Sequence, residues 1–135
     1  DLQHVGKKMD LSALEQMHAM KTGALLICAV LLGGIAAQVS KDHLKSLHSF
    51  AKALGLAFQV VDDILDATAD SATLGKTAGK DAAQDKPTYV TLKGLDYAQE
   101  LAKELKGRAL NSLSQFGPEA DALRHLAGLV VDRKK

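Results

Sequence analysis

The chain has 135 residues, which is enough for one domain with its own core and too few for two. Its formal net charge of +1 gives no reason to expect binding to nucleic acid. Alanine, leucine and lysine are frequent, aromatic residues make up 4% and there are 2 prolines, so the composition favours an all-α fold.

The first helix is predicted to follow a non-periodic stretch at residues 1–10. Ser12 and Glu15 match the capping-box pattern, which predicts a helix start. The helix continues through residues 22–37, which carry no charged side chain and include several glycines. A membrane span needs about 20 predominantly apolar residues, so we expect a helix buried in a large helical core and no membrane span.

Cysteine usage and the N-terminus bear on the compartment. Cys28 is the only cysteine and lies in the apolar stretch, so a buried thiol in a reducing compartment is expected. The N-terminus lacks the apolar segment and cleavage site of a secretory signal. Both observations favour a cytoplasmic protein.

A second helix is predicted to begin near Ser40 or Asp42 and to end near Asp70. Its apolar residues recur at alternating spacings of three and four, as on the buried face of a helix. They are Leu44, Leu47, Ala51, Leu54, Phe58, Val61 and Leu65. Residues 70–88 hold two glycines and a proline among polar residues, which predicts a long loop of the kind that is usually functional or disordered.

The remainder of the chain is predicted to be helical with two interruptions. A third helix is expected over residues 89–105, continued over residues 109–116 beyond a bend at Gly107. Its candidate core positions are Leu92, Leu95, Leu101 and Leu105. A break at Gly117-Pro118 precedes a last helix over residues 119–131, which is followed by a basic tail.

Polar side chains share one stripe of the second predicted helix. Gln59, Asp62, Asp63 and Asp66 stand at positions i, i+3, i+4 and i+7. Neighbouring carboxylates repel each other and destabilise a helix. A hard cation such as Mg²⁺ would offset that repulsion, because it takes oxygen ligands and is often held by carboxylates together with substrate phosphates. An ordinary solvated acidic face is the alternative interpretation.

Lysines near this stripe are candidates for binding a diphosphate. Lys76, Lys80 and Lys86 stand in the predicted loop, although each could instead be an ordinary exposed lysine. Lys21 stands at the start of the uncharged stretch. It either faces an anionic ligand beside Thr22 or reaches solvent from an exposed helix end.

Two other kinds of site find no support. Gly75-Lys76-Thr77 lacks the first glycine and the preceding strand of a phosphate-binding P-loop. The 5 histidines show no metal-ligand spacing, which argues against zinc. His18 could flank the Lys21 site, but a surface position is expected for it.

Three blocks of the sequence resemble the trans-isoprenyl diphosphate synthase family, and most closely its bacterial farnesyl diphosphate synthases. They are residues 18–25, residues 55–66 with the D-D-x-x-D motif, and residues 74–81 followed by Lys86. The resemblance covers nearly all of the chain. It implies that residues 1–135 form the C-terminal half of the isoprenoid synthase helical bundle.

The resemblance also implies roles for particular residues. The metal ligands, which would hold Mg²⁺ against an allylic diphosphate, would be Asp62, Asp63 and Asp66. The lysines that bind the same diphosphate, and act with Asp62 and Asp63 in catalysis, would be Lys21 and Lys76. The residues that line the allylic site or support the diphosphate region would be Thr22, Gln59, Asp81 and Lys86.

The implied reaction joins two diphosphates. Diphosphate leaves an allylic substrate (dimethylallyl or geranyl diphosphate), and isopentenyl diphosphate captures the cation to give farnesyl or a related prenyl diphosphate. The family's first acidic motif and its isopentenyl diphosphate site are not found in the sequence. We therefore expect a missing N-terminal half of the same enzyme, a homodimer, and no turnover by this chain alone. The alternatives are a non-catalytic helical partner subunit of such a synthase and a generic helical interaction domain.

Overall fold

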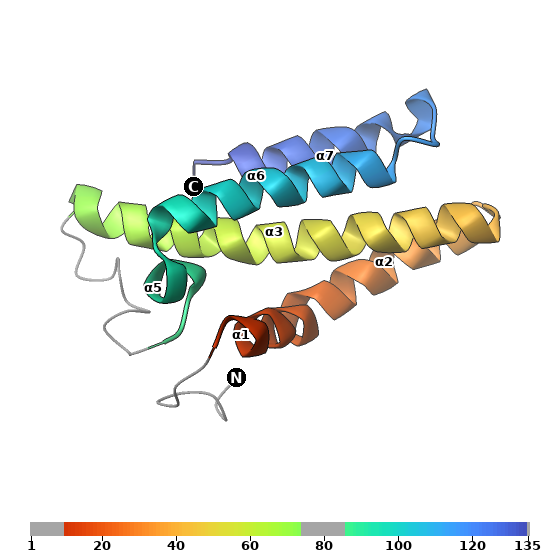
Figure 1. Ribbon diagram of the computed structural model, residues 1–135. Helices are drawn as coiled ribbons and strands as arrows, with labels where there is room; N and C mark the ends of the chain where they lie inside the picture. The colour runs from red at the N-terminus through yellow and green to blue at the C-terminus, as the bar shows by residue number, and fades with distance from the viewer. Residues whose placement is uncertain (1–9, 74–85, 135) are drawn as a thin grey trace.

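α3, which spans Lys41–Thr73, is the helix on which the others pack (Figure 1). α6 (Leu95–Ser112) and α7 (Asp121–Asp132) cover one side of it. α1 (Leu11–His18) and α2 (Ala24–Ala36) follow each other along the opposite side. α3 is therefore the middle of three helical layers.

Three short elements join these helices in the computed structural model, which describes residues 10–73 and 86–134. η2 (Ala19–Gly23) is a π-helical turn between α1 and α2. α5 (Tyr89–Lys93) precedes α6, and η3 (Pro118–Ala120) is a 3₁₀ turn before α7. Every regular element in the described ranges is helical, so the predicted all-α fold is confirmed.

Buried apolar side chains form two clusters along α3. The first joins α1, α3, α5 and α6 and includes the fully buried Leu14, Val60 and Tyr89. The second joins α3, α6 and α7 and includes the fully buried Phe50 and Leu113. Burial on this scale is the main source of stability in a helical domain, because isolated helices are marginal in water.

The predicted apolar stripe of α3 faces this core. Its buried members are Leu47, Ala51, Leu54 and Val61. Its half-buried members are Leu44, Phe58 and Leu65. The helix begins at Lys41, as predicted, and ends at Thr73, beyond the predicted end at Asp70.

The N-terminus of α1 is capped by Asp10. Its side chain accepts a hydrogen bond from the backbone N–H of Ala13 at 2.8 Å. The predicted capping box of Ser12 and Glu15 is wrong, because an aspartate that caps as well as serine stands two residues earlier and the helix already includes Ser12.

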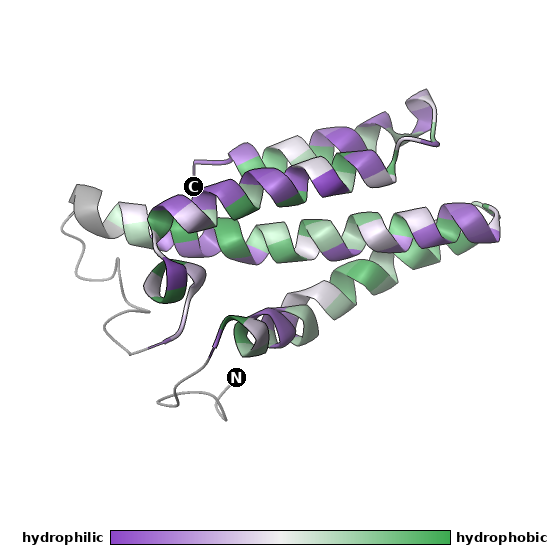
Figure 2. Cartoon of the chain, viewed as in Figure 1, coloured by the Kyte–Doolittle hydropathy of each residue, from purple (hydrophilic) through white to green (hydrophobic). Residues whose placement is uncertain are grey.

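α2 is apolar along most of its length (Figure 2), yet Gly34 is its one buried residue. Leu25, Leu32 and Ile35 are 76%, 60% and 60% exposed, and Cys28 is exposed as well. The prediction of a buried core helix with a buried thiol is therefore wrong for this chain. The physical reason is that α3 is the main helix packed against α2 among the described residues.

The continuous helical stretch Leu11–Ala36 reaches a mean hydropathy of 1.9 and is long enough to cross a membrane. Only 11% of the most apolar 18-residue segment within this stretch is buried. The core helix of a soluble protein meets the same criteria of length and composition. Hydropathy alone therefore does not separate a membrane span from the core helix that we predicted.

One glycine separates α5 from α6. Gly94 has a φ of 95°, a conformation that residues with a Cβ rarely adopt. It splits the helix predicted over residues 89–105, whereas the bend predicted at Gly107 is wrong because α6 continues through that residue. The four predicted core leucines divide into the buried Leu105, the half-buried Leu95 and Leu101, and the exposed Leu92.

Arg124 closes the turn between α6 and α7. Its guanidinium donates hydrogen bonds to the carbonyl oxygens of Leu113 (3.0 Å), Phe116 (2.6 Å) and Gly117 (2.9 Å). These acceptors follow the end of α6, where helix geometry leaves carbonyls without partners. α7, which confirms the predicted last helix, then runs back along α6 and brings the C-terminus to the middle of α3 (Figure 1).

Candidate functional site

Two of the residues singled out from the sequence, Thr22 and Gln59, meet where η2 crosses α3. A Cβ on Gly55 of α3 would lie 3.1 Å from the Cα of Gly23 in η2. That distance is shorter than ordinary van der Waals contact, so the facing glycines allow the two backbones to approach closely. The approach sets Thr22 beside the polar stripe of α3.

A hydrogen bond joins the two helices at this crossing. Gln59 Nε2 donates to Thr22 Oγ1 at 2.7 Å, and Gln59 is buried. The structure therefore brings together the two residues predicted to line the allylic site. Thr22 lies in the π-helical turn, a local irregularity of a kind that is frequent at functional sites. No pattern in the sequence predicted this turn.

Asp62 is paired with Arg133 from the C-terminal end of the chain. The guanidinium donates to Asp62 Oδ1 and, at 3.2 Å, to the carbonyl oxygen of Phe58. It also lies over the Phe58 ring, 4.4 Å from its centroid. Sequence reasoning treated Arg133 only as part of a basic tail. The antiparallel order of the last two helices was the signal that could have placed it beside the acidic stripe.

Asp63 points into the protein. It is 9% exposed, and its Oδ2 accepts a hydrogen bond from the backbone N–H of Tyr89 at 3.0 Å. Asp66 is half-buried one turn further along α3. An ordinary solvated face, the alternative interpretation of the acidic stripe, is therefore wrong for Asp63 and for the buried Gln59.

His18 is buried, and the expected surface position is wrong. It is 5% exposed, and its ring lies 5.4 Å from the ring of Tyr89, centroid to centroid. Burial, helped by the positive charge of Lys21 and opposed by Asp62, lowers the pKa of His18 from 6.5 to about 4. His18 is therefore neutral at pH 7, and its pKa responds to the charge of Lys21 in η2 and to that of Asp62 in α3.

Tyr89 is a buried residue at the site that sequence reasoning missed. Burial first, and then the negative charges of Glu15 and Asp63, raise its pKa well above the usual range for tyrosine. Sequence reasoning had named His18 as a residue that could flank the Lys21 site. No local pattern indicated that Tyr89 would lie against it.

The predicted lysines are placed unequally. Lys21 is exposed on η2, next to the residues that contact α3. Lys86 is exposed just before α5. Lys76, Lys80 and Asp81 lie outside the described residues. Exposure of Lys21 agrees with either interpretation given for it, since both a solvent-facing lysine and a lysine facing a diphosphate are accessible.

The carboxylates of the stripe do not form a closed metal cage. Within the described ranges, no three or more His, Cys, Asp or Glu side chains come close enough to hold a metal ion together. Asp62 and Asp63 instead contact Arg133 and the Tyr89 backbone. Their oxygens suit Mg²⁺ in its common mode, in which one or two carboxylates share the ion with phosphate oxygens and water.

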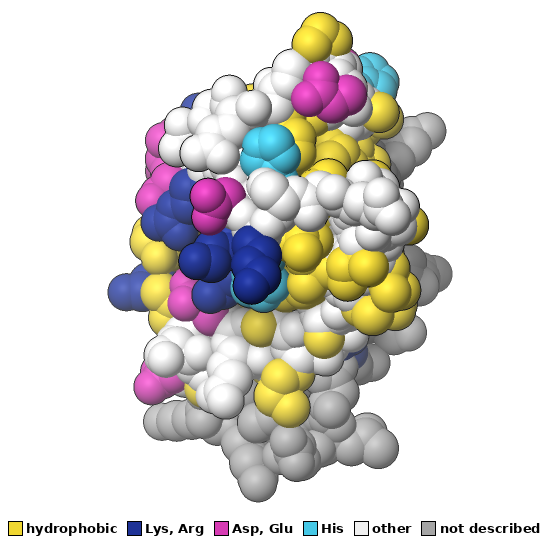
Figure 3. Space-filling view, turned by 90° about the vertical axis from the view of Figure 1, so that its right-hand side faces the viewer, with side chains coloured by type: hydrophobic (Ala, Val, Ile, Leu, Met, Phe, Trp, Pro, Cys, Tyr) yellow, Lys and Arg dark blue, Asp and Glu magenta, His cyan; other side chains and the backbone are white. Residues whose placement is uncertain are grey.

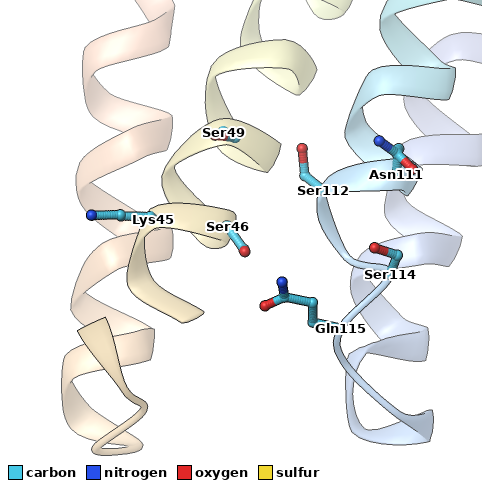
Figure 4. A pocket seen from close by; sticks show the side chains of 7 residues that line it. All are labelled: Lys45, Ser46, Ser49, Asn111, Ser112, Ser114 and Gln115. Carbon is cyan, nitrogen blue, oxygen red and sulfur yellow. The ribbon is translucent and has the colours of Figure 1, made fainter. Parts of the chain in front are cut away.

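A separate polar depression of about 210 Å³ lies between the start of α3 and the end of α6 (Figure 4). Ser46 and Gln115 point toward each other across it, and Lys45 is its one charged lining residue. Figure 3, which views this end of the bundle, shows Lys and Arg gathered on one side and apolar side chains on the other. The depression contains no carboxylate and is not part of the candidate site.

Known proteins share the sequence and the fold. The sequence model for "Polyprenyl synthetase" matches residues 1–120. Farnesyl diphosphate synthase of Escherichia coli is 43% identical over 139 residues, which cover 100% of this chain and 46% of that protein. A chloroplastic geranylgeranyl pyrophosphate synthase of Catharanthus roseus is 47% identical over 112 residues, which cover 83% of this chain and 31% of that protein.

A solved structure agrees. The apo FPP/GFPP synthase from Zymomonas mobilis superposes with a TM-score of 0.78 and 32% identity, over 96% of this chain and 41% of that one. The chain spans less than half the length of these relatives. Because the family match covers most of its residues, the chain belongs to the polyprenyl synthetase family.

Proposed function

We propose that this chain is the C-terminal part of a prenyl diphosphate synthase, which joins isopentenyl diphosphate to an allylic diphosphate to make farnesyl or a related prenyl diphosphate. The observation that carries this proposal is the close crossing of η2 and α3. It brings Thr22 into a hydrogen bond with Gln59 on the polar stripe of α3, and Lys21 is the exposed residue just before Thr22. One face thus offers a cation and carboxylates to the same ligand.

The residues of this face divide the work of binding. Asp62, Asp63 and Asp66 would share Mg²⁺ with the oxygens of the allylic diphosphate. When bound, the ion stabilises the negative charge that develops on the departing diphosphate. Lys21 adds a fixed positive charge on the other side of the crossing, and Lys76 is assigned to the same group by the resemblance.

The hydrogen bonds already present keep these groups in place. The Thr22–Gln59 bond fixes the position of η2 relative to α3. Arg133 contacts Oδ1 of Asp62, so we assign the second oxygen of that carboxylate to the metal. Phe58, beneath the guanidinium of Arg133, contributes an apolar wall that would exclude water from the allylic cation.

The exposed face of α2 also finds a role in this proposal. Large apolar patches on a protein surface mark interaction sites. The relatives are more than twice as long as this chain. We infer that further helices of the same bundle cover Leu25, Leu32 and Ile35 and carry the isopentenyl diphosphate site and the first acidic motif. A cytoplasmic homodimer completes the proposal.

A chimera tests the proposal directly. This chain replaces the matching 46% of the Escherichia coli farnesyl diphosphate synthase, and prenyl transfer is measured with Mg²⁺, isopentenyl diphosphate and dimethylallyl or geranyl diphosphate. We expect turnover by the chimera, none by the 135-residue chain, and a loss of at least about 100-fold with Asp62→Ala. Asp42→Ala, an exposed carboxylate in the first turn of the same helix, is the matched control.

A non-catalytic partner subunit is the second candidate, and the Arg133–Asp62 pair favours it because an arginine neutralises one of the acids. The two functions differ in ligand binding. A catalytic chain binds Mg²⁺ with pyrophosphate at the acidic stripe, and a partner subunit does not. The catalytic function would be excluded if the chimera folds but shows no turnover and the 135-residue chain does not bind Mg²⁺ with pyrophosphate.

A further inference from the structure

Two buried polar atoms beside the site have no hydrogen-bond partner within the described part of the chain. They are Nδ1 of His18 and the hydroxyl oxygen of Tyr89. The residues are 5% and 0% exposed. A buried polar atom without a partner costs stability, and leucine or phenylalanine would fill the same positions without that cost. The contacts that these two residues do make, through the His18 ring and through the Tyr89 ring and backbone, are therefore the ones that bear on the site.

The two residues complete a ladder of contacts between the continuous helix formed by α1 and η2 and the facing helix α3. The first rung is the Thr22–Gln59 hydrogen bond. His18 stands four residues before Thr22 on one helix, and Asp63 stands four residues after Gln59 on the other. One helical turn away from the first rung, His18 and Asp63 are therefore the corresponding positions, and Tyr89 lies between them.

Tyr89 contacts both sides of this second rung. Its backbone N–H donates to Asp63 Oδ2 at 3.0 Å, and its ring packs on the ring of His18. The first amides of a helix have no partner within that helix, so the N–H of Tyr89 is available for an outside acceptor. Thr88 and Thr91 hold this end of α5 with a reciprocal capping box at 3.0 and 2.8 Å.

We propose that His18 and Tyr89 are positioning residues that hold the Asp63 carboxylate in register with Lys21 and Thr22 across the crossing. The ligand named here, a metal-bound diphosphate, rests on the function proposed above. His18 fixes the ring of Tyr89, and Tyr89 fixes the carboxylate. Neither side chain touches the ligand.

The positioning role differs from a role in folding because other contacts also hold the two helices together. The first rung and the Gly23–Gly55 contact still hold η2 against α3 when the second rung is loosened. Loosening it weakens one of the contacts that orient the Asp63 carboxylate. Residues that orient metal ligands from behind usually change metal affinity by about 10- to 100-fold when they are replaced.

The test compares truncating and shape-conserving variants of the 135-residue chain. Binding of Mg²⁺ with inorganic pyrophosphate is measured by titration calorimetry. We expect His18→Ala and Tyr89→Leu to weaken binding by about 10-fold or more. His18→Leu and Tyr89→Phe keep the packing and should bind as the parent chain does. His125→Ala and Tyr97→Leu, at exposed positions on α7 and α6, are the matched controls.

A second measurement does not depend on the ligand. Hydrogen exchange at the Tyr89 amide reports the bond to Asp63, and we expect it to become about tenfold faster in His18→Ala, with no change in His125→Ala. Unchanged exchange in a folded His18→Ala chain overturns the proposal even if the parent chain fails to bind pyrophosphate. Equal losses of binding in His18→Leu and His18→Ala also overturn it, because the imidazole would then act on the ligand directly.

Discussion

Replacing Gly55 with alanine tests the helix crossing on which the candidate site depends. In an open helical position, Gly→Ala stabilises a protein by roughly 0.5–1 kcal/mol, because alanine loses less backbone entropy. At Gly55 the new Cβ would stand 3.1 Å from the Cα of Gly23 and 3.6 Å from Leu26 Cδ2. The first of these contacts is with backbone, which cannot rotate out of the way.

The balance of the two effects sets the expected magnitude. Overpacking a well-packed contact costs about 1–3 kcal/mol, which exceeds the gain in helix propensity. We therefore expect Gly55→Ala to lower the free energy of unfolding by about 1–2 kcal/mol. Moving η2 away from α3 also lengthens the 2.7 Å bond between Thr22 and Gln59, so Mg²⁺–pyrophosphate binding should weaken as well.

The matched control is Gly107→Ala in the middle of α6, where an added Cβ meets nothing within 4 Å. This variant should be more stable than the parent chain by about 0.5–1 kcal/mol. Urea unfolding followed by circular dichroism gives both values on one scale. If both alanines stabilise the chain equally, the backbones of η2 and α3 do not approach each other as described, and the candidate site is not built on this crossing.

Three further predictions concern stability. His18 has its pKa lowered to about 4 in the folded chain, so the free energy of unfolding should fall by up to about 3 kcal/mol as the pH drops from about 6.5 to about 4. Urea titrations at several pH values measure this dependence, and His18→Leu should remove it. Arg124→Ala leaves the carbonyls at the end of α6 without their donor and should lower the free energy of unfolding by about 2 kcal/mol. Arg108→Ala removes an exposed ion pair and should change the free energy of unfolding by less than about 0.5 kcal/mol. Asp10→Ala removes the N-cap of α1 and should cost about 1 kcal/mol, while an equal loss in Ser12→Ala would show that serine is the cap after all.

Periodic features of the sequence predicted the fold well. The apolar stripe of α3 extends over several turns, so one irregular position does not disturb it, and the start of the helix was placed to within one residue. Features that depend on one residue were predicted poorly. The break at Gly94 needs a φ of 95° that glycine permits but does not require, and nothing in the local pattern separated Gly94 from Gly107.

The site was predicted in part for the same reason. Spacing on one helix placed Gln59, Asp62 and Asp63 together, because neighbours on a helix face follow from geometry alone. Their partners come from elsewhere in the chain. Arg133 contacts Asp62 across a sequence separation of 71 residues, and Tyr89 contacts Asp63 across a separation of 26 residues. Such contacts depend on how helices pack, which one sequence does not reveal.

Burial explains why the acidic stripe differs from the solvated face that was its alternative. Gln59 and Asp63 are removed from water, and removing a polar group from water is costly unless a partner replaces the lost hydrogen bonds. Each has such a partner, in Thr22 and in the Tyr89 amide. Asp62 remains more accessible, with 45% of its side chain exposed, and it pairs with the long side chain of Arg133, which is 24% exposed. The stripe thus combines carboxylates held from behind with carboxylates that face outward, and it is this division that lets one helix both anchor the crossing and present oxygens to a cation.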